Sequence, residues 1–317
     1  MPNYNGVWSL STQYQYAADW PQPPAVALFA GGTNSNVIEF MFFASTGGSS
    51  DYGDLHVKST APAMVGSTTR AVHYGGEDVA RMDFFPIGQG GTVADFGDAS
   101  VQRKYLTGFG NTTRGIFAGG SSGGPTYHNV MDYITIASTG DATDFGDLTA
   151  AMAGYNASAA STTRGMIFGG QTSNNVNSRI NVVEYVTIAN TGNAVDFGDM
   201  NVKRGSPGGL SSNTRALVGG GRDESNTQTL TIDYFTIAST GNASDFGDLN
   251  NDGTARNDGT SNGIKGVFGI GSFSATGTSY TYDTVTIATT GNATDFGNPA
   301  ENKGAKAATS GSHGGIG

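Results

Sequence analysis

The sequence predicts an all-β protein, a six-bladed β-propeller, and three observations carry this prediction. The triplet Asp-Phe-Gly occurs five times, and a variant, Asp51-Tyr52-Gly53, occurs once, at intervals of 44 to 52 residues. An acidic residue precedes every triplet by twelve positions, and an apolar segment ending in glycine lies upstream of each acid. Six units of about 40–50 residues are typical of propeller blades, each a four-stranded antiparallel sheet.

Each unit contains four segments with the properties of short strands. The first is rich in small residues and leads into a Thr-Arg pair, and the second is apolar and ends in Gly-Gly, as at 116–120. The third alternates polar and β-branched residues, as at 132–137, which favours a half-buried strand. A turn with Gly and Asn or Asp follows, and the fourth segment carries Asp-Phe-Gly. We expect Phe145 and its equivalents to fill the space between blades.

The two ends of the chain complement each other. The first unit begins at its second strand, 26–30, and residues 304–313 have the composition of the missing first strand, with His313 in the place of the repeated Arg. We expect 307–313 to pair with 26–30, because this pairing closes the ring and covers two open strand edges. The propeller is therefore expected to span 25–317.

The charged residues of the repeat are expected to have structural roles. Six copies of Asp-Phe-Gly argue against the metal-binding triplet of kinases, which occurs once per kinase domain. We expect one Arg–Asp pair per blade, because a guanidinium group binds a carboxylate through a planar fork. The alternative is a ring of Arg that binds an anion in the central channel, which the net charge of −10 disfavours. The repeated residues are Asp51, Asp95, Asp144, Asp196, Asp245, Asp295, Arg70, Arg114, Arg164, Arg215 and Lys265.

Composition argues against several classes of function. The chain has no Cys, its four His are scattered, and its acids mostly follow the repeat, so we expect no catalytic, metal-binding or cofactor-binding residues. Asn- and Gly-rich turns such as 250–253 are explained by turn chemistry without a bound ion. The acidic balance argues against nucleic acid as a partner. No segment approaches the ~18–20 apolar residues of a membrane span.

Two regions outside the repeat are the candidates for recognition. The connections between the second and third strands vary in length, and loops on a rigid scaffold commonly carry recognition. Their candidate surface residues are Tyr127, His128, Arg222 and Tyr280; the alternative is neutral variation in solvent. The segment 1–24 holds both Trp of the chain and is expected to form an arm, either packed on its own propeller or anchored to a neighbouring subunit. Its proposed contacts are Trp8, Tyr14, Tyr16 and Trp20.

The amino-acid sequence of the repeat resembles the repeats of known protein families. Its Gly-Gly strand and period resemble kelch-type propellers. The succession Thr-Thr-Arg-Gly, Phe-x-Gly-Gly and Asp-Tyr-Ile-Thr-Ile-Ala-Ser-Thr-Gly-Asn-Ala-x-Asp-Phe-Gly-Asp-Leu is similar to kelch-like virion proteins of tailed bacteriophages, marine ones especially. The resemblance covers about residues 25–313, and the segment around Trp8 and Trp20 is similar to leaders of such proteins.

This resemblance implies a non-enzymatic structural protein on the exterior of a phage particle. We expect a tail-associated or fibre-like protein, present in multiple copies, that contacts other virion proteins and recognises a glycan or protein of the host surface. The first alternative is a decoration protein of the capsid surface. The second is a propeller that binds or cleaves glycans.

Overall fold

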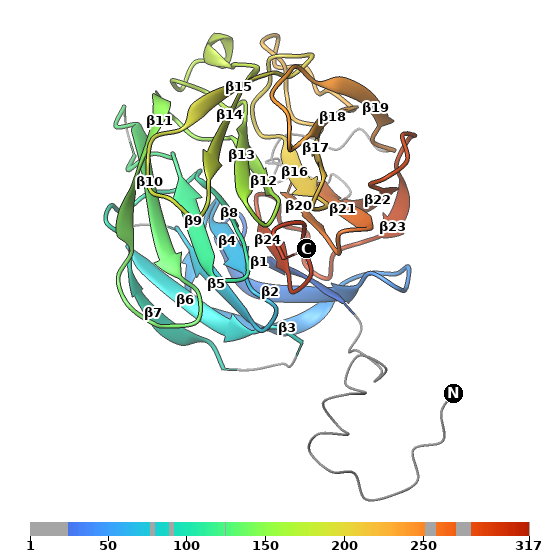
Figure 1. Ribbon diagram of the computed structural model, residues 1–317. Helices are drawn as coiled ribbons and strands as arrows, with labels where there is room; N and C mark the ends of the chain where they lie inside the picture. Colours follow the sequence, from blue (N-terminus) through green and yellow to red (C-terminus); the bar gives the residue numbers. More distant parts are fainter. Residues whose placement is uncertain are drawn as a thin grey trace, which may run out of the picture.

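The structure, a computed structural model, describes residues 25–76, 80–88, 92–123, 125–250, 258–270 and 280–316. These residues form six four-stranded antiparallel sheets around a central axis, which confirms the expected six-bladed propeller (Figure 1). The 1–24 segment, with Trp8, Tyr14, Tyr16 and Trp20, lies outside the described residues. The helical structure of the described part is a 3-10 turn, η2 (Val176–Ser178).

The blades are numbered along the chain. The strands of each blade are given in order from the innermost strand, beside the channel, to the outermost. Blade 1 contains β24 (Ala307–Ser310), β1 (Val26–Ala30), β2 (Ser35–Phe42) and β3 (Ser50–Ser59). Blade 2 contains β4 (Ala63–Gly66), β5 (Arg70–Tyr74), β6 (Arg81–Pro86) and β7 (Ala94–Asp98). Blade 3 contains β8 (Thr107–Gly110), β9 (Arg114–Ala118), β10 (His128–Thr135) and β11 (Thr143–Met152).

The other three blades repeat this order. Blade 4 contains β12 (Ala157–Ala160), β13 (Arg164–Phe168), β14 (Val182–Thr187) and β15 (Val195–Asp199). Blade 5 contains β16 (Gly208–Ser211), β17 (Arg215–Gly219), β18 (Thr231–Thr236) and β19 (Ser244–Asp248). Blade 6 contains β20 (Asp258–Ser261), β21 (Lys265–Ile270), β22 (Thr281–Thr286) and β23 (Thr294–Gly297).

Blade 1 is built from both ends of the described chain, as expected. Strand β24 pairs antiparallel with β1, with Phe29 opposite Ala308 and Ala27 opposite Ser310. The pairing ends at Ser310, so it is shorter than the expected segment 307–313. Residues 311–316 turn away from the sheet instead, toward the middle of the ring (Figure 1).

The core lies between adjacent blades, where the Phe of each Asp-Phe-Gly triplet is buried. Phe145 of blade 3 packs in one cluster with Ile188 and Ala194 of blade 4. Burial of one such ring contributes roughly 1.5–3 kcal/mol. Gly146 follows because a Cβ there would stand 2.5 Å from the Gly192 carbonyl oxygen of blade 4. The triplet therefore docks each outer strand on the turn of the next blade.

Candidate functional site at the loop face of the channel

The acids twelve residues before the triplets are the buried acids of the fold. All six are at most 3 % exposed, whereas the Asp residues of the triplets themselves are exposed. A shift in strand register precedes each buried acid, as between Met131 and Asp132 of β10, and a β-bulge of this kind redirects a side chain. The buried acids are Glu39, Asp83, Asp132, Glu184, Asp233 and Asp283.

Each buried acid joins its blade to the preceding segment of chain. In blades 2, 4, 5 and 6 the carboxylate accepts a backbone N–H from the segment that leaves the previous blade, as in Thr149 N to Glu184 Oε1 at 3.1 Å. Glu39 of blade 1 accepts the Glu301 N–H in the same way, and Asp132 of blade 3 accepts the Ser100 hydroxyl. Each of these acids therefore has at least one carboxylate oxygen that accepts a hydrogen bond within the fold.

The repeated Arg residues do not form the Arg–Asp pairs expected of them. Each guanidinium lies over an aromatic ring of the third strand of its own blade, with centroid distances of 4.3 to 4.4 Å, as Arg164 does over Tyr185. Each also donates to a backbone carbonyl of the next blade, as Arg164 Nη1 does to Ile237 at 2.6 Å. Lys265 donates to the Phe43 carbonyl oxygen. The physical reason is that the aromatic ring stabilises the positive charge of the guanidinium by a cation–π interaction, while the carbonyl oxygen accepts one of its N–H groups. No carboxylate is therefore needed beside these Arg residues.

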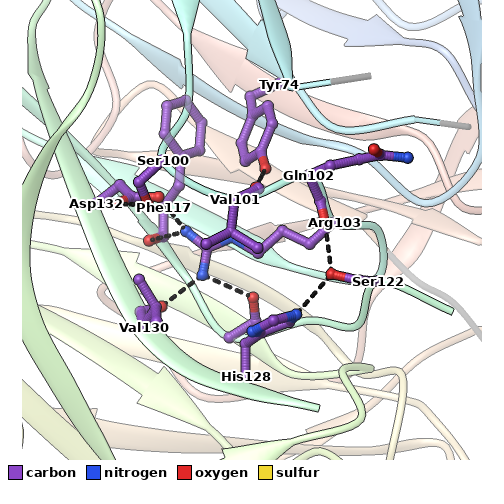
Figure 2. A network of polar contacts seen from close by, with 11 residues as sticks. Tyr74, Ser100, Val101, Gln102, Arg103, Phe117, Ser122, His128, Val130 and Asp132 are labelled. Atoms are coloured by element: carbon purple, nitrogen blue, oxygen red, sulfur yellow. Dashed lines mark hydrogen bonds and ion pairs between the residues drawn. The ribbon is translucent and has the colours of Figure 1, made fainter. Parts of the chain in front are cut away.

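The buried cations that pair with the acids come from elsewhere. Arg103 Nη2 lies 2.6 Å from Asp132 Oδ2, and Arg103 also donates to the carbonyl oxygens of Phe117, Gly119 and Val130 (Figure 2). Arg204 repeats this arrangement with Asp233 in blade 5. Both Arg stand 29 residues before their acid, and this second interval is the sequence signal that would have found the pairs.

Glu184 of blade 4 differs from its equivalents. Ala153 stands 31 residues before it and occupies the position that Arg103 and Arg204 have relative to their blades. The Glu184 carboxylate accepts from the Thr149 N–H and hydroxyl, while its Oε2 has no hydrogen-bond partner among the described residues. Burial raises the pKa of this carboxyl, and the hydrogen bonds from Thr149 oppose the rise.

The C-terminal turn lies at one end of the central channel, where His313 joins the residues of the first strands. His313 Nε2 lies 2.9 Å from the Gly66 carbonyl oxygen of blade 2, and Gly315 N donates to His313 Nδ1 at 3.1 Å. Gly315 packs so closely on blade 3 that a Cβ would stand 1.8 Å from the Gly110 oxygen, and Gly314 lies against blades 4 and 5. Burial lowers the pKa of His313. His313 therefore lies at the end of the channel and contacts the adjacent blade 2 instead of taking the place of a repeated Arg.

The opposite end of the channel opens on the loop face, which carries the connections after the second strand of each blade, such as 169–181. A non-glycine residue with positive φ stands two positions before the first strand of five blades. Backbone hydrogen bonds run from one to the next, from Tyr105 N to Ala61 O, Tyr155 N to Tyr105 O and Ser206 N to Tyr155 O. The five residues are Ala61, Tyr105, Tyr155, Ser206 and Ala305. Their side chains surround the mouth of the channel.

Comparison with known proteins gives no assignment. No protein-family model and no curated protein matches this chain. Within the described ranges, no three His, Asp or Glu side chains come together as metal ligands, and no helix is long and apolar enough to cross a membrane.

The loops of consecutive blades are connected to one another on the loop face. The Tyr127 hydroxyl of blade 3 accepts the Asn174 N–H of blade 4 at 3.1 Å. Arg179 of blade 4, which is 7 % exposed, donates to the Asp223 carbonyl and to Asn226 Oδ1 of blade 5. Three loops of different sequence thus form one continuous surface.

The other predicted surface residues have separate surroundings. His128 Nε2 lies 2.6 Å from the Ser122 hydroxyl, and burial lowers its pKa (Figure 2). Arg222 exchanges backbone hydrogen bonds with Gly205, and its Nε has no hydrogen-bond partner among the described residues. Tyr280 lines a small hollow with Phe29 and Lys303, near the junction of the chain ends. The structure therefore places Tyr127, His128 and Arg222 on the connected loops of blades 3 and 5, whereas Tyr280 lies near the junction of the chain ends.

Proposed function

We propose that the protein is a non-enzymatic structural protein of a bacteriophage virion that recognises the host surface through its loop face. The observation that carries the proposal is the connected loop surface of blades 3 to 5. Tyr127 and Arg179 tie three variable loops into a fixed arrangement. A binding surface that is ordered before it meets its partner loses less conformational entropy on binding.

The chemistry of the repeat supports a scaffold role in the same proposal. An acid used for hydrolysis needs an oxygen that faces substrate, whereas the six buried acids accept hydrogen bonds from the chain within the fold. The virion assignment comes from the resemblance of the repeat to phage proteins. Within the particle we propose a tail-associated position, and a capsid-surface decoration protein is the alternative.

Immunogold labelling of purified particles tests the assignment. We expect antibodies against the propeller to label the tail of intact virions. Labelling spread over the head would favour the decoration protein, and particles free of the protein would contradict the proposal. Incubation with host surface polysaccharide provides the second check, because release of reducing ends would overturn the non-enzymatic assignment.

A further inference from the structure

Arg222 of blade 5 stands at a position that recurs on the loop face. The residue there forms one isolated β-bridge with the segment before the first strand and another with its own loop, and its equivalents are Ser121 in blade 3 and Gln171 in blade 4. The Gln171 side chain is used by the fold, because its amide donates to two carbonyls of its own loop and accepts from Arg179. Arg222 puts a positive charge at the same position.

The fold makes no polar contact with the Arg222 guanidinium within the described ranges. No hydrogen bond or ion pair joins it to these residues; its Nε is buried, and the partly exposed residue presents its terminal nitrogens at the surface. The neighbouring Asp223 turns its carboxylate to the loop backbone, where Oδ1 accepts the N–H groups of Ser225 and Thr227 at 2.9 and 2.8 Å. The terminal N–H groups of Arg222 are therefore available to a ligand.

Arg179 places a second positive charge beside Arg222. Gly205 exchanges two backbone hydrogen bonds with Arg222, and residues paired in this way point their side chains to the same face. A Cβ on Gly205 would stand 3.3 Å from Arg179 Nε, so the Arg179 guanidinium lies on the face from which the Arg222 side chain rises. Burial, and after it the charge of Arg222, lower the pKa of Arg179. An anion that contacts this face relieves the repulsion between the two cations.

The chemistry of the two groups and of their loops narrows the class of ligand. A guanidinium offers parallel N–H groups that match the two oxygens of a carboxylate. Arg179 already donates to three groups of the loops, so it contributes charge while Arg222 contributes donors. The loop segments 172–175 and 225–229 carry only hydroxyl and amide side chains, which suit the hydroxyls of a sugar. The net charge of −10 opposes an anion weakly, since physiological salt screens charges beyond about 8 Å.

We propose that Arg222, with Arg179 beside it, binds the carboxylate of an acidic sugar on the loop face. The inference deepens the proposed recognition role and rests on that role only for its biological meaning, because binding by the purified protein is a property of the site itself. Particles that still incorporate a variant without Arg222 would leave the virion assignment intact. The site and the virion assignment can therefore fail separately.

Two variants separate the site from the overall charge. Arg222→Gln introduces the residue that blade 4 has at the equivalent position, so it removes the cation with a side chain that the fold accepts there. Lys203→Gln is the control, because it removes an equal charge from the exposed ion pair with Glu224. We expect Arg222→Gln to melt within a few degrees of the wild type. A large drop in melting temperature would show that Arg222 supports the fold, and it would overturn the proposal.

Saturation-transfer NMR measures binding of the methyl glycosides of glucuronic and galacturonic acid, with methyl glucoside and methyl galactoside as neutral matches. We expect at least one acidic sugar to give a signal that its neutral match lacks. Arg222→Gln should weaken that signal by roughly tenfold or more, since a hydrogen bond to a charged group is lost, while Lys203→Gln retains it. No signal with either acidic sugar, equal signals with the neutral matches, or a signal that Arg222→Gln leaves unchanged would overturn the proposal. So would an equal signal from N-acetylglutamate amide, which would indicate an acidic peptide as the ligand.

Discussion

Asp132 and Glu184 stand at the same place in the repeat, but their neutralisation is expected to have opposite effects. Asp132→Asn leaves the buried Arg103 without its counter-ion, and the loss of one partner of a buried pair costs about 3–5 kcal/mol. Glu184→Gln removes a buried charge that has no cationic partner among the described residues, so we expect it to be as stable as the wild type or more so at pH 8. Urea unfolding of both variants measures the difference, and equal destabilisation by the two would contradict it.

The pH dependence of Glu184 follows from the direction of its shift. Because its pKa is raised in the fold, the folded protein holds this proton more tightly than the unfolded chain does. The corresponding stability is present below the ordinary pKa of Glu and is lost as the pH rises through the raised value. The advantage of Glu184→Gln should therefore appear at pH 8 and vanish near pH 4.

His73 is expected to make the fold sensitive to acid. Burial lowers the pKa of this imidazole to about 4, against the opposing effect of Asp83. Below pH 6.5 the His73 imidazole is therefore protonated in the unfolded chain but remains neutral in the folded protein until the pH approaches 4. The contribution of neutral His73 to the free energy of unfolding is present above pH 6.5 and is lost as the pH falls toward 4. The shift corresponds to about 3 kcal/mol. His73→Gln should lose less stability than the wild type between pH 7 and pH 4 in urea titrations, and parallel losses would refute the assignment.

At the scale of single elements, β24 is expected to decide the solubility of the whole ring. Removal of 303–317 takes away the strand that pairs with β1 and the turn in which His313 contacts blade 2. The uncovered β1 edge exposes unpaired N–H and C=O groups, which template association between chains. We expect the truncated protein to form aggregates in size-exclusion chromatography and light scattering. A soluble monomer with an unchanged melting temperature would contradict this.

The blades could be predicted from the sequence because their period is encoded several times in each unit. The glycine pairs, the alternation of the third strand and the Asp-Phe-Gly of the fourth strand all indicate the same blade, and Gly146 shows the structural reason through its close approach to Gly192. The roles of the charged residues could not be predicted in the same way. A register shift just before Asp132 breaks the alternation and places this acid inside, while its cross-strand partner Asp144 is exposed.

At the scale of the whole molecule, the 1–24 segment is expected to be separable from the propeller. The described residues already form a closed ring without it. We therefore predict that a protein without 1–24 melts within a few degrees of the full chain. It should no longer assemble onto particles, because the proposed anchor with Trp8 and Trp20 is missing. Calorimetry and particle reconstitution measure the two properties. A large drop in melting temperature would show that the segment packs on its own propeller, and continued incorporation would exclude it as the anchor.

The join between β24 and β1 also sets the order of events during synthesis. Strands β1 to β3 leave the ribosome before the strands of the other five blades, yet their blade is completed only by β24, which follows all of those strands in the sequence. The nascent protein carries an open edge at β1 until β24 has been synthesised, and ring closure waits for that strand. A product that terminates before β24 therefore cannot close the ring, however many blades it contains. Its unpaired β1 edge is a feature by which cellular quality control can recognise the incomplete polypeptide.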